Sequence, residues 1–140
     1  MVFDPRCSRS APPLAKRRSS TNDAWLKGIA MLTTGKAIKV TVYLSDGAKH
    51  KGVPVYTTVL DFLYNNGVAG ATVCKGVAGF GLGHRIHAAH ILELSDHLPI
   101  KLEFIDSTEK VESILPQLQE RCGCGLIEVQ ETSVIVPVRK

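Results

Sequence analysis

Two segments have the side-chain alternation of a strand, and each is followed by a segment with the periodicity of a helix. This pattern limits the folds open to the chain more than any other feature. Residues 38–44 and 100–104 alternate between apolar and polar side chains, which predicts two half-buried strands. A helix is predicted after each of them, and further strands are predicted over residues 69–74 and within residues 126–138. The predicted order is therefore strand, helix, strand, strand, helix, strand.

The first predicted helix has a clear beginning and end. Pro54 suits its first position, because the N–H group that proline lacks would be unpaired there in any case. Val55, Val59 and Leu63 then recur at four-residue spacing and supply an apolar face. Asn66-Gly67 is a typical stop signal, so we expect the helix to end there.

The second predicted helix carries one unusual residue. Asp106 and Glu109 predict a capping arrangement at its beginning, and Gly123 and Gly125 predict its end. Pro116 lies between them and would cost about 3 kcal/mol in a regular helix interior, so a kink or distorted turn is expected. The apolar face is predicted to consist of Val111, Ile114, Leu115 and Leu118.

This order of elements is that of the ferredoxin-like fold. The fold class is therefore α+β, with a β-α-β-β-α-β antiparallel sheet, two helices on one face and a long glycine-rich loop after the second strand. Such a sheet leaves its other face and both of its edges uncovered. Association of several copies is a common way to cover them.

The net positive charge is confined to the beginning of the chain. Residues 1–30 hold six Lys/Arg and two Asp, hence +4, whereas residues 31–140 hold eleven charges of each sign and are neutral. Residues 1–34 lack periodicity and are expected to be a disordered basic tail before a domain over residues 35–140. Met31 directly precedes the first strand and is a candidate for the true start of translation. The neutral body argues against a nucleic-acid partner.

Composition favours a cytoplasmic protein. No stretch reaches the roughly 18 unbroken apolar residues of a membrane-spanning helix, and no apolar run precedes a cleavage site near the N-terminus. Cys7, Cys74, Cys122 and Cys124 do not form a disulfide framework, so reduced thiols are expected. The Cys122-Gly-Cys124 pair lacks the two-residue spacer of dithiol and zinc motifs, which leaves ordinary helix-end residues and a metal or redox pair as alternatives.

A glycine-rich loop follows the second predicted strand. Its glycines at positions 76–83 would permit positive φ and let backbone N–H groups converge on an anion. Lys75, His84 and Arg85 add positive charge, and arginine can bind two phosphate oxygens at once. No Gly-Lys-Ser/Thr follows, so this is not a Walker loop. A flexible surface loop without a ligand is the alternative interpretation.

Four motifs in and around this loop resemble one protein family. They are Gly70-Ala-Thr-Val-Cys-Lys-Gly76, Gly79-Phe80-Gly81, Ile86-His87 and the run from Leu98 to Asp106. In order and spacing they resemble the PII-like family called domain of unknown function 190, over nearly all of residues 36–138. The second and fourth motifs also resemble the PII signalling proteins, which are ferredoxin-like homotrimers. Those proteins bind adenine nucleotides in clefts between subunits and engage partner proteins through a long loop.

The resemblance implies a homotrimeric, non-catalytic signalling protein without a cofactor. Its effector would be a small anion, in particular an adenine nucleotide such as ATP, ADP or AMP, bound in a cleft between subunits. The loop would change its order on binding and so present or hide a surface for a partner protein, for example a membrane transporter.

The resemblance also implies the residues of the ligand site. Lys75 and Arg85 would contact the phosphates, and Phe80 would either stack on the adenine or anchor the loop. The PII proteins grip phosphates with a basic loop before the last strand, whereas the corresponding Glu120–Leu126 holds one cation, so Arg139 or Lys140 would compensate. The full set is Lys75, Gly79, Phe80, Gly81, His84, Arg85, His87, Gly123, Gly125 and Arg139.

Three histidines support a rival interpretation. His84, His87 and His90 recur at three-residue spacing, so on a helix they would share a face and could hold a transition metal. On a strand, His87 would point away from the other two, and the pattern from Ile86 to Leu94 fits either element. A metal-binding protein related to copper-tolerance proteins of PII fold is therefore the alternative function. No grouping of acid, base and nucleophile suggests catalysis.

Overall fold

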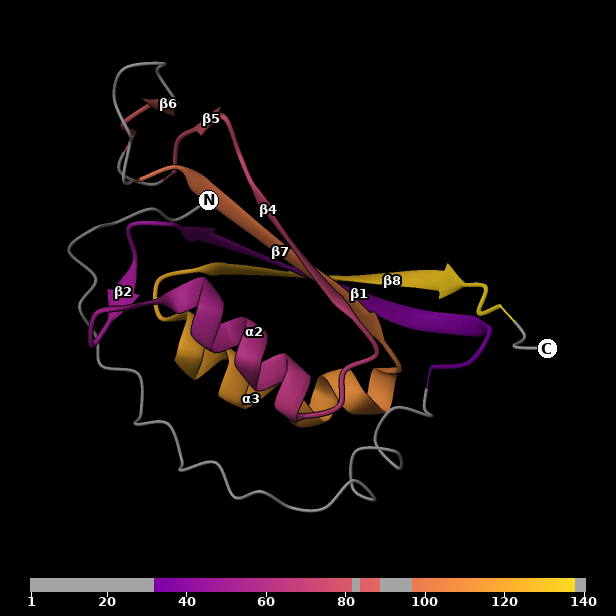
Figure 1. The fold of residues 1–140 in the computed structure, drawn as a ribbon. Coiled ribbons are helices and arrows are strands. Elements are labelled where there is room, and N and C mark those ends of the chain that lie inside the picture. The colour runs from indigo at the N-terminus through magenta and orange to yellow at the C-terminus, as the bar shows by residue number, and fades with distance from the viewer. Residues whose placement is uncertain (1–31, 82–83, 89–96, 138–140) are drawn as a thin grey trace.

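The computed structural model describes residues 32–81, 84–88 and 97–137, which form a four-stranded antiparallel sheet with both helices on one face (Figure 1). The sheet consists of strands β1 (Gly35–Ser45), β4 (Ala71–Lys75), β7 (Pro99–Asp106) and β8 (Leu126–Val134), and the helices are α2 (Val55–Asn65) and α3 (Thr108–Cys122). The strand order is β4-β7-β1-β8. The predicted ferredoxin-like α+β fold is therefore confirmed.

Two short hairpins complete the described part of the chain. They are formed by β2 (Lys49–His50) with β3 (Val53–Pro54), and by β5 (Ala78–Gly79) with β6 (His87–Ala88). The pattern from Ile86 to Leu94 fitted both a helix and a strand. His87 and Ala88 form a strand, whereas residues 89–94 lie outside the described residues. Of the tail predicted over residues 1–34, residues 1–31 lie outside the described residues.

The core lies between the helices and the inner face of the sheet. Antiparallel register places Val40 opposite Phe104 and Val42 opposite Leu102, and all four side chains are buried. These are the positions that the period-two pattern assigned to the core. The helices add the buried residues Val59, Phe62, Leu63, Val111, Ile114 and Leu118. Each such side chain contributes about 1.5–3 kcal/mol through its removal from water.

The helix ends differ in detail from the predicted ones. The N-cap of α3 is Ser107 and not Asp106: the Ser107 side chain accepts a hydrogen bond from the Lys110 N–H at 3.3 Å. Pro54 was predicted to be the first residue of α2. It is instead the N-cap, and the helix begins one residue later at Val55. Helix α3 continues through Pro116, whose side chain is exposed.

Asp106 does not cap α3. Its side chain instead connects the end of β7 with the segment before β4 and with the beginning of α3. Its carboxylate is buried at the end of β7 and accepts hydrogen bonds from the N–H of Ala69 at 2.8 Å and of Ser107 at 2.7 Å. The first bond holds the segment that leads into β4, and the second holds the beginning of α3. One side chain therefore satisfies two backbone donors that would otherwise lack partners.

We predict that Asp106→Ala lowers the free energy of unfolding by about 2–4 kcal/mol, because two backbone N–H groups lose a charged acceptor. Urea denaturation followed by circular dichroism measures the change. Asp61→Ala is the matched control: Asp61 is exposed on α2 and its removal should change stability by less than about 0.5 kcal/mol. Equal effects of the two substitutions would contradict this role of Asp106.

Candidate functional site

The glycine loop begins at a close contact with Pro99. The Gly76 N–H donates to the Pro99 carbonyl at 2.7 Å, and a Cβ at Gly76 would lie 2.7 Å from the Pro99 ring. At Gly79 the corresponding distance is 3.1 Å. Among the described glycines, positive φ occurs at positions 35, 52, 67 and 123, so the positive φ predicted for the loop is wrong for Gly76, Gly79 and Gly81. Gly76 and Gly79 are needed because the backbone approaches a proline ring.

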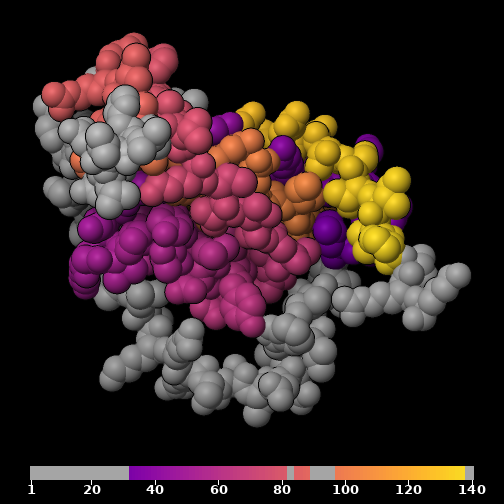
Figure 2. Space-filling model, turned by 45° about the horizontal axis from the view of Figure 1, so that its top comes forward, coloured from indigo at the N-terminus to yellow at the C-terminus, as the bar shows by residue number. Residues whose placement is uncertain are grey.

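The loop projects beyond the end of the sheet (Figures 1 and 2). Strands β5 and β6 pair so that Gly79 lies opposite His87. Phe80 is 53% exposed, and its ring stacks on His84 with 6.0 Å between the ring centroids. Phe80 thus contacts another loop residue and keeps much of its surface open. Arg85, beside His84, is exposed as well.

Lys75 is held at the beginning of the loop by Asp46, a residue just after β1 that was not among the predicted site residues. Its ammonium nitrogen lies 2.6 Å from Oδ2 of Asp46, whose side chain is only 11% exposed. The Asp46 N–H in turn donates to the Leu98 carbonyl, just before β7. Among the described residues, Asp46 Oδ1 and His50 Nε2 are both buried without a hydrogen-bond partner. The acid after the first strand was visible in the sequence, but its contact with Lys75 depends on the strand order.

The turn between α3 and β8 lies at this same end of the sheet. A Cβ at Gly125 would lie 2.6 Å from Cδ2 of Leu44 and 3.1 Å from the Tyr43 carbonyl oxygen, so Gly125 packs against the end of β1. Gly123 caps α3 with a φ of +56°. Arg121, the cation of this stretch, stacks on Phe62 at 4.3 Å from the ring centroid and so contacts the core. Arg139 lies outside the described residues.

The loop histidines do not form the predicted series. His84 contacts Phe80, whereas His87 contacts His97, and His90 lies outside the described residues. Within the described ranges, no three His, Cys, Asp or Glu side chains form a group that could hold a metal ion.

Two of the cysteines that were expected to be reduced are free thiols in the structure, Cys74 and Cys122. Cys122, at the end of α3, is buried, and burial raises the pKa of its thiol to about 12, so it stays protonated at neutral pH. A protonated, buried thiol does not act as a metal ligand or nucleophile, so Cys122 belongs to the core.

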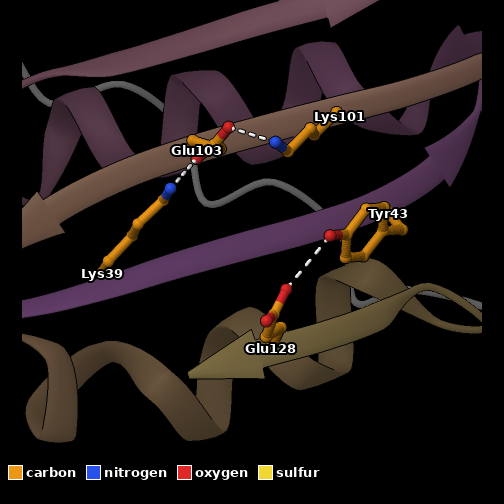
Figure 3. Close-up of polar contacts among 5 residues, drawn as sticks. All are labelled: Lys39, Tyr43, Lys101, Glu103 and Glu128. Carbon is orange, nitrogen blue, oxygen red and sulfur yellow. Dashed lines mark hydrogen bonds and ion pairs between the residues drawn. The ribbon is translucent and has the colours of Figure 1, made fainter. Parts of the chain in front are cut away.

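The outer face of the sheet carries an ordered polar network (Figure 3). Glu103 on β7 forms ion pairs of 2.7 Å with both Lys101 and Lys39, which lower the pKa of its carboxyl group. The Tyr43 hydroxyl donates to Glu128 at 3.1 Å, and this bond raises the pKa of the tyrosine. These side chains occupy the face that the helices leave uncovered.

A separate hollow of about 490 Å³ lies at the other end of β4, away from the glycine loop. It is lined by Leu32, Lys39, Ala69, Gly70, Ala71, Thr72, Glu103, Phe104 and Ile105. None of the predicted ligand residues belongs to it. In the described part of the chain, neither helix is long and apolar enough to cross a membrane.

Comparison with known proteins agrees with the fold. The domain of unknown function 190 (DUF190), described as "Uncharacterized ACR", matches residues 37–134. A UPF0166 protein of Methanocaldococcus jannaschii is 35% identical over 85 residues, which cover 61% of this chain and 78% of that protein. A UPF0166 protein of Aquifex aeolicus is 30% identical over 94 residues, which cover 67% of this chain and 89% of that protein.

Solved structures of CPII, a nitrogen regulatory PII-like protein from Thiomonas intermedia K12, have the same fold. The structure bound to ADP, AMP and bicarbonate has a TM-score of 0.54 at 21% identity, over 76% of this chain and 92% of CPII. The structure bound to ADP and bicarbonate has a TM-score of 0.53 at 20% identity, again over 76% of this chain and 92% of CPII. With the family match over residues 37–134, these findings confirm the predicted relationship: the chain belongs to the DUF190 family of PII-like fold.

Proposed function

We propose that this protein is a non-catalytic, PII-like regulator that binds a small anionic effector, most specifically an adenine nucleotide. The observation that carries the proposal is the meeting of two turns at one end of the sheet. There the glycine loop begins against Pro99, and the Gly123–Gly125 turn packs against the end of β1. The binding of ADP, AMP and bicarbonate by CPII, which shares the fold, supports an anion or nucleotide as the ligand.

The exposed positive charge of the loop favours phosphate as the group recognised. Arg85 is exposed and can bind two phosphate oxygens with its planar guanidinium group. Lys75 lies at the beginning of the loop, although its ammonium group is paired with Asp46. An incoming phosphate would share or replace that carboxylate, so ligand binding would be coupled to the contact that holds the loop to the β1–β2 turn.

A second copy of the chain would complete the site. The loop projects from the body and the outer sheet face has no covering layer within the described residues (Figure 2). In a homotrimer, a neighbouring subunit would close the open side of the loop and form the cleft. Ordering of the glycine-rich loop would then present or hide a surface for a partner protein, such as a membrane transporter.

We predict that the trimer binds ATP, ADP or AMP and that Arg85→Ala weakens the binding by roughly one to two orders of magnitude. Loss of one charged phosphate contact costs about 1.5–3 kcal/mol, which gives this range. Isothermal titration calorimetry measures it. Lys36→Ala, an exposed cation at the beginning of β1 and far from the loop, should leave the affinity unchanged. Absence of binding below about 1 mM to a verified trimer would refute the nucleotide proposal.

A homotrimer is predicted for the full chain at micromolar concentration. Light scattering coupled to size-exclusion chromatography should give the mass of three chains, because the uncovered sheet face and both edge strands favour association. The mass of a single chain would remove the intersubunit cleft and contradict the proposed site.

A further inference from the structure

Two histidines that are ten residues apart meet where the glycine loop returns to the sheet. His87 belongs to β6 and is paired with Gly79, and His97 lies two residues before the start of β7 at Pro99. Their ring centroids are 5.5 Å apart, and the ring planes are inclined at 64°. His87 is half-buried and His97 is exposed, so the pair can be reached from solvent.

The geometry points to a two-histidine site for a divalent transition metal, formed by His87 and His97. It differs from the predicted series of loop histidines, because His84 stacks on Phe80 instead. Neutral imidazole is a preferred ligand of zinc, copper and nickel. This inference does not depend on the proposed nucleotide site, since neither histidine has to contact a nucleotide in order to bind a metal.

The observed separation of the rings fits a shared ion. A Zn–N bond of about 2.0–2.1 Å places each imidazole centroid about 3.2 Å from the metal, so two tetrahedral ligands have centroids about 5.2 Å apart. The measured 5.5 Å lies within about 0.3 Å of that value. The distance between the rings is therefore compatible with one nitrogen of each ring binding the same ion.

The described residues supply two ligands, because no group of three ligating side chains exists among residues 32–81, 84–88 and 97–137. The other coordination positions of the metal are left open by these residues. A metal bound here would link β6 to the residue that leads into β7. It would thus hold the returning end of the loop close to Pro99, against which Gly79 packs.

Zinc titration of the full chain without a histidine tag tests this inference. We expect one zinc ion per chain by isothermal titration calorimetry, and a weakening of at least about tenfold in both His87→Ala and His97→Ala. His84→Ala removes an imidazole from the same loop but not from the pair, and should leave zinc affinity within about twofold. Cobalt gives a second readout, because its visible absorption should be lost in the same two variants.

Three results would overturn the inference. The first is the absence of zinc binding to the folded wild-type chain at millimolar metal, which would leave the pair as an aromatic contact only. The second is zinc binding that His97→Ala does not change but His84→Ala or His90→Ala abolishes, which would favour the three-histidine series. The third is an equal loss in all variants including His84→Ala. Circular dichroism of each variant confirms that it is folded, and nucleotide titration of His97→Ala separates this inference from the proposed function.

Discussion

The antiparallel pairing of β1 with both β7 and β8 determines where the candidate site lies. Ser45 pairs with Pro99 and Tyr43 pairs with Leu126, so the end of β1 meets the beginnings of both neighbours. Strand β4 then ends beside the beginning of β7. As a result the β1–β2 turn, the glycine loop and the turn at Gly125 are gathered at one end of the sheet, while the apolar core fills the space beneath its middle.

At that end, the contacts that hold the loop are polar and incompletely satisfied. Asp46 pairs with Lys75, but its second carboxylate oxygen and Nε2 of His50 are buried without hydrogen-bond partners in the part of the chain that the structure describes. The beginning of the loop is thus attached to the sheet through polar side chains, whereas the sheet and the helices are held together by the buried apolar core.

The sequence predicted the parts of the structure that depend on local patterns. Strand and helix positions followed from side-chain periodicity, because each element buries a face against one common core. Ser107 was missed as a cap because Asp106 is an equally good capping residue type, and only its burial between β4 and α3 excludes it. The glycines of the loop were assigned a conformational role, but Gly76 and Gly79 pack on Pro99, a contact that spans about twenty residues. The contact of Asp46 with Lys75 is likewise long-range, and that of His87 with His97 depends on how the chain returns from β6 to β7, so no local pattern encodes either.

In the proposed function, the ferredoxin-like sheet carries a loop whose order depends on a nucleotide. Amide hydrogen exchange of the full chain, with and without saturating ADP, tests it most directly. Exchange is expected to slow at residues 76–81 and 84–88 when ADP is added, while residues 38–44 and 100–104 in the sheet exchange slowly in both states. Unchanged exchange in the loop, or slowing confined to the distant hollow at residues 69–72, would contradict it.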